Sequence, residues 1–293
     1  MGDGLIMVSG KKIPSREKLS WDTIEYIENV PNHFLIPEHH WPNFQKTSLS
    51  LKEKIRLNHF ACFFMCEMFV HFERLIIEYI KIHENIISKY LNERQIRKFV
   101  DEELDHINAF QTLAKIIRPD LYSPDQRFLL PTAGDRFVIR HSPPGVFFIM
   151  AALFEEMTVF VYEVMKEKLD ESWKPVLDVM HLHALEERGH ISMDRKIADG
   201  IRQEKGLLRA QLEMTVLLPL VAYSDRRVAG SWKKAAEFFA DSEGFSPKKK
   251  KEILNKGLSR SDLLGMKSFA DKISERPIAG TGTLRFVLNK MAG

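Results

Sequence analysis

Two short stretches of this sequence repeat one pattern of acidic residues and histidine, and they constrain the fold more than any other feature. The first is Glu102-Glu103-Leu104-Asp105-His106, and the second is Glu186-Glu187-Arg188-Gly189-His190. Each contains Glu-x-x-His, a spacing that places both side chains on one face of an α-helix. Two such motifs, with one further Glu from each of two other helices, are typical of four-helix bundles that hold a metal pair.

The second stretch is preceded by another histidine on the same helix face. His183 lies four residues before Glu187 and seven before His190. Because seven residues return to within about 20° of the starting direction, the three side chains form one stripe. One helix therefore offers two imidazoles and a carboxylate, and one metal position would be richer in nitrogen than the other.

A further carboxylate is expected from the helix that precedes the first motif. Glu73 has only apolar neighbours three and four residues away, namely Phe69, Val70, Ile76 and Ile77. A lone carboxylate in such a stripe is costly to bury unless it binds a cation or is protonated. Glu67 is the alternative, but Arg74 and His71 share its side of the helix and could form a salt bridge with it.

A weak internal repeat guides the choice among the remaining carboxylates. The interval from Glu73 to Glu103 matches the interval from Glu156 to Glu187 to within one residue. Each half of the chain then reads as a helix with one buried Glu followed by a helix with Glu-x-x-His. The repeat favours Glu73 over Glu67, and Glu156 over its neighbour Glu155.

The expected metal site contains residues from four helices. Four carboxylates with imidazoles suit two iron ions, and manganese is also possible. Glu102 and Glu186 directly precede the ligand Glu of each motif and are placed to accept a hydrogen bond from a ligand imidazole. Asp194, one turn beyond His190, is a similar candidate. The expected metal ligands are Glu73, Glu103, His106, Glu156, His183, Glu187 and His190.

The pattern of apolar residues predicts an all-α protein with a ferritin-like four-helix bundle. A capping box, Ser50-Leu51-Lys52-Glu53, should begin the first long helix. Residues 118–143 are rich in proline and indicate a long crossover between the two helical pairs. Pro219 is expected to bend a further helix that begins after residue 203. The four long helices are expected over about 51–92, 93–117, 145–170 and 171–201, with short helices over 20–29, 231–241, 248–256 and 261–274.

We interpret residues 1–293 as a single ferritin-like di-iron domain. It would consist of an irregular N-terminal segment (1–46), a metal-binding bundle (50–205), and accessory helices with a tail (206–293).

Composition excludes several other classes of protein. The formal net charge is only +3, and Lys248–Lys251 is the one dense basic run, so a nucleic-acid partner is not expected. The two cysteines, Cys62 and Cys66, lie one turn apart in an apolar helix and suit a reduced core. Without a secretory signal or an uninterrupted apolar span, we expect a cytoplasmic protein without a membrane partner.

Residues of the expected site also resemble a known family. Glu73, Glu103-x-x-His106, Glu156 and His183-x-x-x-Glu187-x-x-His190 resemble the non-haem di-iron N-oxygenases typified by p-aminobenzoate N-oxygenase and the chloramphenicol-pathway arylamine oxygenase. The resemblance covers about residues 50–205, and the additional His183 is its specific part. The family separates its first two carboxylates somewhat more widely than Glu73 and Glu103 are separated here, which keeps Glu67 as an alternative to Glu73.

The resemblance implies an O2-dependent biosynthetic monooxygenase that oxidises the nitrogen of an arylamine or an amino-acid-derived amine. The implied mechanism uses a peroxo-diferric intermediate, and the implied assembly is a homodimer. Apolar residues beside the ligands would then shape the substrate pocket, such as Phe69, Phe110, Val159 and Phe160. Electrons must come from an external reductant or donor protein, since no flavin or nicotinamide motif is present.

Two alternatives use the same metal site. The first is a di-iron enzyme that performs C-hydroxylation, desaturation or oxidative C–C cleavage. The second is a ferritin-like protein that handles iron without an organic substrate. The irregular ends and His183 disfavour the second alternative, because storage of iron requires neither.

Overall fold

The chain folds almost entirely into α-helices, as expected from the sequence. The computed structural model describes residues 19–37, 47–167, 172–206, 212–213 and 215–256, together with the backbone of 7–8 and 11–12. The helices are α1 (Leu51–Ile87), α2 (Glu93–Ile117), α3 (Ala133–His141), α4 (Pro144–Lys166), α5 (Lys174–Lys205), α7 (Leu217–Ser242) and α8 (Pro247–Lys256). The remaining elements are a 3-10 turn, η2 (Trp21–Thr23), and an antiparallel hairpin of β1 (Met7–Val8) and β2 (Lys11–Lys12).

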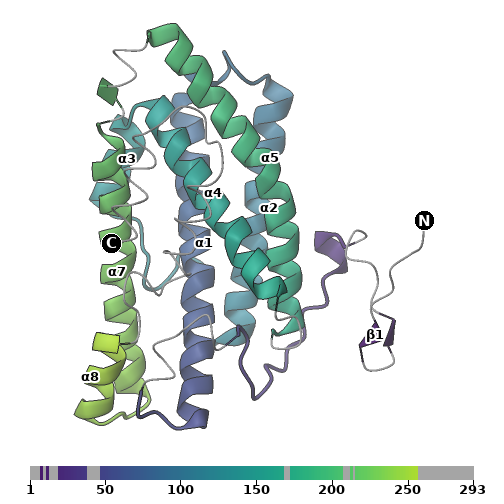
Figure 1. Cartoon of the computed structure of the whole chain (residues 1–293), viewed down its shortest axis with the longest axis vertical. Coiled ribbons are helices and arrows are strands. Elements are labelled where there is room, and N and C mark those ends of the chain that lie inside the picture. The colour runs from purple at the N-terminus through teal and green to yellow at the C-terminus, as the bar shows by residue number, and fades with distance from the viewer. Residues whose placement is uncertain are drawn as a thin grey trace.

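Helices α1, α2, α4 and α5 run side by side through the molecule (Figure 1). Helix α1 packs mainly against α2, and α4 packs mainly against α5. Contacts between α2 and α5 and between α1 and α4 join the two pairs. Helix α7 lies along α1 and α4, and α8 packs on α7. The two segments with Glu-x-x-His, on α2 and α5, therefore belong to neighbouring helices.

Side-chain caps explain where the first two long helices begin. Ser50 accepts a hydrogen bond from the backbone N–H of Glu53, and the Glu53 side chain returns to the Ser50 backbone. This capping box confirms the predicted start of α1. Asn92 caps α2 in the same way, by accepting from the backbone of Gln95. Helix α2 has the predicted bounds, whereas α1 ends at Ile87, five residues earlier than expected.

The segments between and after the long helices differ from the prediction in three places. Residues 133–141 of the crossover form α3, a short helix capped by Thr132. Helix α5 extends to Lys205, and the expected separate helix over 231–241 is part of α7. Pro219 lies in the first turn of α7, where the missing N–H breaks no helical hydrogen bond, and so it does not bend a helix.

The expected helix over 20–29 is limited to the turn of η2. The expected helix over 261–274 and the tail lie outside the described residues.

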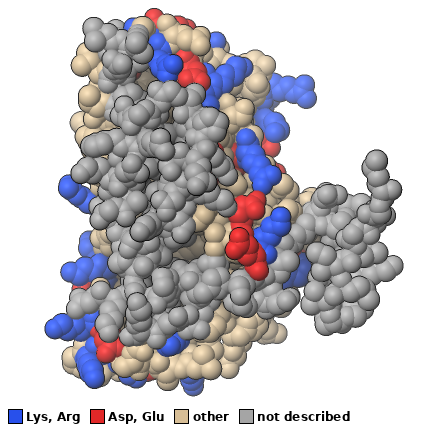
Figure 2. All heavy atoms as spheres, in the orientation of Figure 1, with Lys and Arg blue, Asp and Glu red and all other residues tan. Residues whose placement is uncertain are grey.

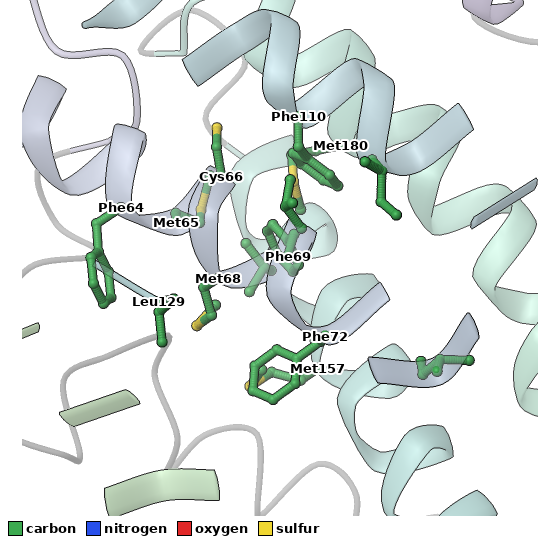
Figure 3. Close-up of a cluster of buried hydrophobic side chains, with 14 of the residues drawn as sticks. Phe64, Met65, Cys66, Met68, Phe69, Phe72, Phe110, Leu129, Met157 and Met180 are labelled. Atoms are coloured by element: carbon green, nitrogen blue, oxygen red, sulfur yellow. The ribbon is translucent and has the colours of Figure 1, made fainter. Parts of the chain in front are cut away.

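The core between the helices is rich in phenylalanine and methionine (Figure 3). Phe69 of α1 stacks on Phe110 of α2 with ring centroids 4.6 Å apart. Both cysteines are free thiols within this core. The other labelled members of the cluster include Phe64, Met65, Met68, Phe72, Leu129, Met157 and Met180. Such a core keeps water away from polar groups that lie next to it.

Helix α4 is the most apolar element that the structure describes. Among the described residues it is the one helix whose length and composition would allow it to cross a membrane, and 78% of its most apolar window is buried inside the protein. On the face shown in Figure 2, Lys and Arg side chains are spread along the edges, and several lie beside Asp or Glu. This distribution agrees with the small net charge of the sequence.

Candidate metal centre

Side chains from α1, α2 and α5 converge in the buried space between the long helices. Two groups of four could each hold a metal ion, and within each group the ligand atoms lie within 4.8 Å of one another. The first group is Glu73, His106, His183 and Glu187, and the second is Glu103, His106, Glu187 and His190. The two groups share His106 and Glu187, so the two positions are adjacent.

Glu187 occupies the middle of this cluster. Its Oε1 lies 2.6 Å from His183 Nε2 and 3.5 Å from His106 Nδ1, and its Oε2 lies 3.3 Å from His190 Nδ1. Glu73 Oε1 approaches the same region, 3.1 Å from His183 Nε2. The stripe of His183, Glu187 and His190 on α5 therefore faces the carboxylates of α1 and α2, as the helical spacing requires.

The two Glu-x-x-His motifs hold each other's imidazoles in place. Nδ1 of His106 lies 3.0 Å from Glu103 of its own helix, and its Nε2 donates to Glu186 of α5 at 3.0 Å. Nε2 of His190 likewise donates to Glu102 of α2 at 3.1 Å. Each imidazole thus turns Nδ1 toward the cluster and binds a carboxylate of the opposite helix with Nε2. Such outer hydrogen bonds orient metal-binding histidines.

Glu73 reaches the cluster from α1, and Glu67 does not. The Glu67 carboxylate accepts hydrogen bonds from the backbone N–H groups of Arg127 and Phe128 in the crossover, at 2.5 and 2.9 Å. The sequence interpretation paired Glu67 with Arg74, but Arg74 donates to Gln126 and to the backbone carbonyl of Pro124. Glu67 therefore anchors the crossover onto α1.

On α4 neither glutamate belongs to the two groups of four, but Glu155 is buried beside them, in contrast to the expected Glu156. Glu156 forms an ion pair with Arg195 at 2.8 Å. Burial raises the pKa of the Glu155 carboxyl well above its usual range, and the nearby charges of Asp194 and Glu187 raise it further. The connection 167–173 is two residues longer than the connection 88–92. The interval from Glu155 to Glu187 is likewise two residues longer than the interval from Glu73 to Glu103.

We expect the two adjacent glutamates of α4 to respond differently to the same substitution. Glu155→Gln should weaken metal binding by at least about 10-fold, since an uncharged amide replaces a carboxylate beside the ions. Glu156→Gln should leave metal binding unchanged and remove only a partly exposed ion pair. Metal content after dialysis against a weak chelator measures both effects, and equal losses in the two variants would contradict the placement of Glu155.

Two other residues lie next to the cluster. Asp194 is fully buried and lies next to Glu155. Among the described residues, it does not accept the hydrogen bond from a histidine imidazole that was expected of it. Trp21 of η2 donates its indole N–H to Glu186 at 3.1 Å. The sequence carries no signal for Trp21, because it lies well before the bundle in a segment without helical periodicity. For Glu155 the sequence did contain a signal, because its neighbours in α4 are as apolar as those of Glu156.

Several buried polar atoms of the cluster lack a hydrogen-bond partner among the described residues. They include Oε2 of Glu73, Oε1 of Glu103, both oxygens of Glu187 and Nδ1 of His190. No N–H or alcohol of the described residues donates to the oxygens of Glu155 and Asp194. Unsatisfied buried oxygens are costly, and several of them pointing into one space are best explained by a bound cation.

In the absence of a cation, protons would compensate the crowded charges. Burial and the nearby Glu103 raise the pKa of the Glu73 carboxyl well above its usual range. Burial opposes protonation of His106, but hydrogen bonds to Glu103 and Glu186 raise its pKa to about 9. Burial also opposes ionisation of Glu187, but the adjacent His183 lowers its pKa to about 2. The metal-free cluster therefore retains protons at neutral pH.

Metal binding should release these protons. Because an ion must displace the proton of His106, the apparent affinity should increase as the pH rises toward about 9 and decrease in acid. Calorimetric titration with iron(II) in buffers of different ionisation enthalpy counts the released protons. Binding without proton release at pH 7 would show that the ions bind elsewhere.

No known protein family, curated protein or solved structure matches this chain in the comparisons made with them. The assignment of a function therefore depends on the side chains of the cluster and on the helices that bring them together.

Proposed function

We propose that this protein is an O2-dependent non-haem di-iron monooxygenase that oxidises the nitrogen of an amine. The proposed fold is a ferritin-like bundle of α1, α2, α4 and α5. The single observation that carries the proposal is the buried cluster, in which both Glu-x-x-His motifs meet Glu73, Glu155 and His183. In this assignment Glu155 takes the place of the expected ligand Glu156.

The donor set fits two divalent ions. Four carboxylates, those of Glu73, Glu103, Glu155 and Glu187, balance the charge of two such ions in a low-dielectric interior. His106, His183 and His190 complete the set, and imidazole with carboxylate suits iron or manganese. Bound iron would supply the activation of O2, while the protein holds the ions and excludes bulk water.

His183 and the aromatic residues around it support an amine as the substrate. The ring of His183 contacts Phe69 and Phe110, with centroids 5.4 and 4.9 Å apart, respectively. These rings make the side of the cluster near His183 apolar and suited to an aromatic group. Val159 and Phe160 of α4 are buried in the same core. We propose that this side of the cluster receives the amine.

Metal analysis followed by product analysis tests the proposal. Protein reconstituted anaerobically should bind two irons per chain, and with a reductant and O2 it should convert one or more amines of a broad panel to N-hydroxyl, nitroso or nitro products. His183→Ala should keep two carboxylate-bound ions but lose N-oxidation. Products oxidised only at carbon, or iron oxidation without any organic product, would contradict the proposal.

A further inference from the structure

His106 and His190 each donate to a carboxylate of the opposite helix, and these two carboxylates have different neighbours near the protein surface. On one side, Lys98 pairs with Glu102 at 2.8 Å, and Glu102 accepts from His190. On the other side, the indole N–H of Trp21 lies 3.2 and 3.1 Å from the two oxygens of Glu186, which accepts from His106. The two chains of hydrogen bonds therefore end differently, in the ammonium group of Lys98 on one side and in the indole of Trp21 on the other.

Trp21 also contacts the cluster directly. Its ring lies 5.6 Å from that of His106, centroid to centroid, although the two residues are far apart in the sequence. Trp21 is partly exposed, whereas His106 is completely buried. A conjugated ring thus connects solvent to a buried metal-binding imidazole through two hydrogen bonds and a ring contact.

The proposed reaction requires electrons from outside the protein, and the inference rests on that function. Oxidation of R–NH2 to R–NHOH by O2 consumes two electrons and two protons, with one oxygen atom joining nitrogen and the other leaving as water. We propose that Trp21 is the point of electron entry, through which a one-electron donor reduces the metal pair by way of Glu186 and His106. The corresponding partner is a one-electron carrier protein or a small one-electron reductant.

The role assigned to Trp21 follows from how the two hydrogen-bond chains end, because the Phe99 ring that packs on His190 at 4.2 Å is buried and has no hydrogen-bond donor. The ammonium group of Lys98 is carried by a saturated chain and has no orbitals suited to accept or pass an electron. The Trp21 indole N–H donates to the Glu186 carboxylate at 3.1 Å, which joins the ring to the cluster by a hydrogen bond to an acidic group. Electrons should therefore enter on the side of His106.

The test follows reduction of the iron centre itself, without an amine. Protein loaded with two ferric ions is mixed anaerobically with reduced methyl viologen, and the loss of ferric absorbance is timed by stopped flow. We expect Trp21→Leu to be reduced at least about 10-fold more slowly than the parent, by analogy with other losses of outer partners of metal sites. Trp21→Phe, which retains a ring without the N–H, should be intermediate.

Two matched variants serve as controls. Lys98→Met removes the outer residue on the side of His190, and Trp232→Phe removes a tryptophan that packs on Phe64 of α1, with ring centroids 5.1 Å apart. Both should be reduced at the rate of the parent.

The outcomes separate this inference from the proposed function. A parent protein that binds no iron refutes the function before any reduction is timed. A Trp21→Leu variant that keeps two irons and is reduced at the parent rate overturns the inference alone. If Trp21→Leu fails to retain iron, the Trp21→Phe variant decides, because a parent-like rate in that variant also overturns it.

Discussion

Glu187→Gln is expected to abolish tight metal binding at both positions of the cluster. Glu187 belongs to both groups of ligands and lies within 3.5 Å of His106, His183 and His190. Glutamine has the same shape but no charge, so the loss of affinity should exceed the roughly 100-fold upper range seen for outer partners of metal ligands. Metal content after gel filtration, measured by elemental analysis, provides the readout.

The same substitution should leave the metal-free protein folded. Because His183 lowers the pKa of Glu187, the charge of Glu187 stabilises the metal-free fold, so the thermal midpoint of the metal-free variant should be equal to or lower than that of the metal-free parent. Glu67→Gln is the matched control on α1, since Glu67 binds backbone amides of the crossover and should retain full metal content. Two irons retained by Glu187→Gln would refute the proposed cluster.

Loading with metal is expected to raise the thermal midpoint of the protein by a large amount. A ligand at 100 times its Kd stabilises the folded state by about 2.7 kcal/mol per site, so two sites contribute about 5 kcal/mol. With about 2–4 °C per kcal/mol for a chain of this size, the midpoint should rise by roughly 10–20 °C. Circular dichroism melts of metal-free and iron(II)-loaded protein under anaerobic conditions measure the shift.

Magnesium offers a control for this increase. Mg2+ prefers octahedral oxygen ligands and retains its waters, so a buried cluster with three imidazoles should bind it weakly and gain little stability. An iron-dependent shift that is matched by Mg2+, or that persists in Glu187→Gln, would indicate binding at surface carboxylates. A shift confined to iron and manganese in the parent would support the cluster.

The helical elements and most of the site follow from hydrogen bonding and periodicity within single helices. The capping box at Ser50, the bounds of α2 and the Glu-x-x-His spacing depend only on hydrogen bonds and periodicity within one helix. For the same reason His183, Glu187 and His190 were expected on one face, and the structure places them together. The choice of Glu73 over Glu67 rested mainly on the internal repeat, together with the apolar neighbours of Glu73 within the same helix.

The tertiary structure decided which residues of other segments reach the cluster. Adjacent residues of a helix point about 100° apart, so the choice between Glu155 and Glu156 depends on how α4 is rotated against α5. That rotation follows from the packing of α4 on α5, which a spacing rule within one helix does not contain. The contact of Trp21 with Glu186 could not be predicted either, because contacts between segments distant in the chain form only when the helices have packed.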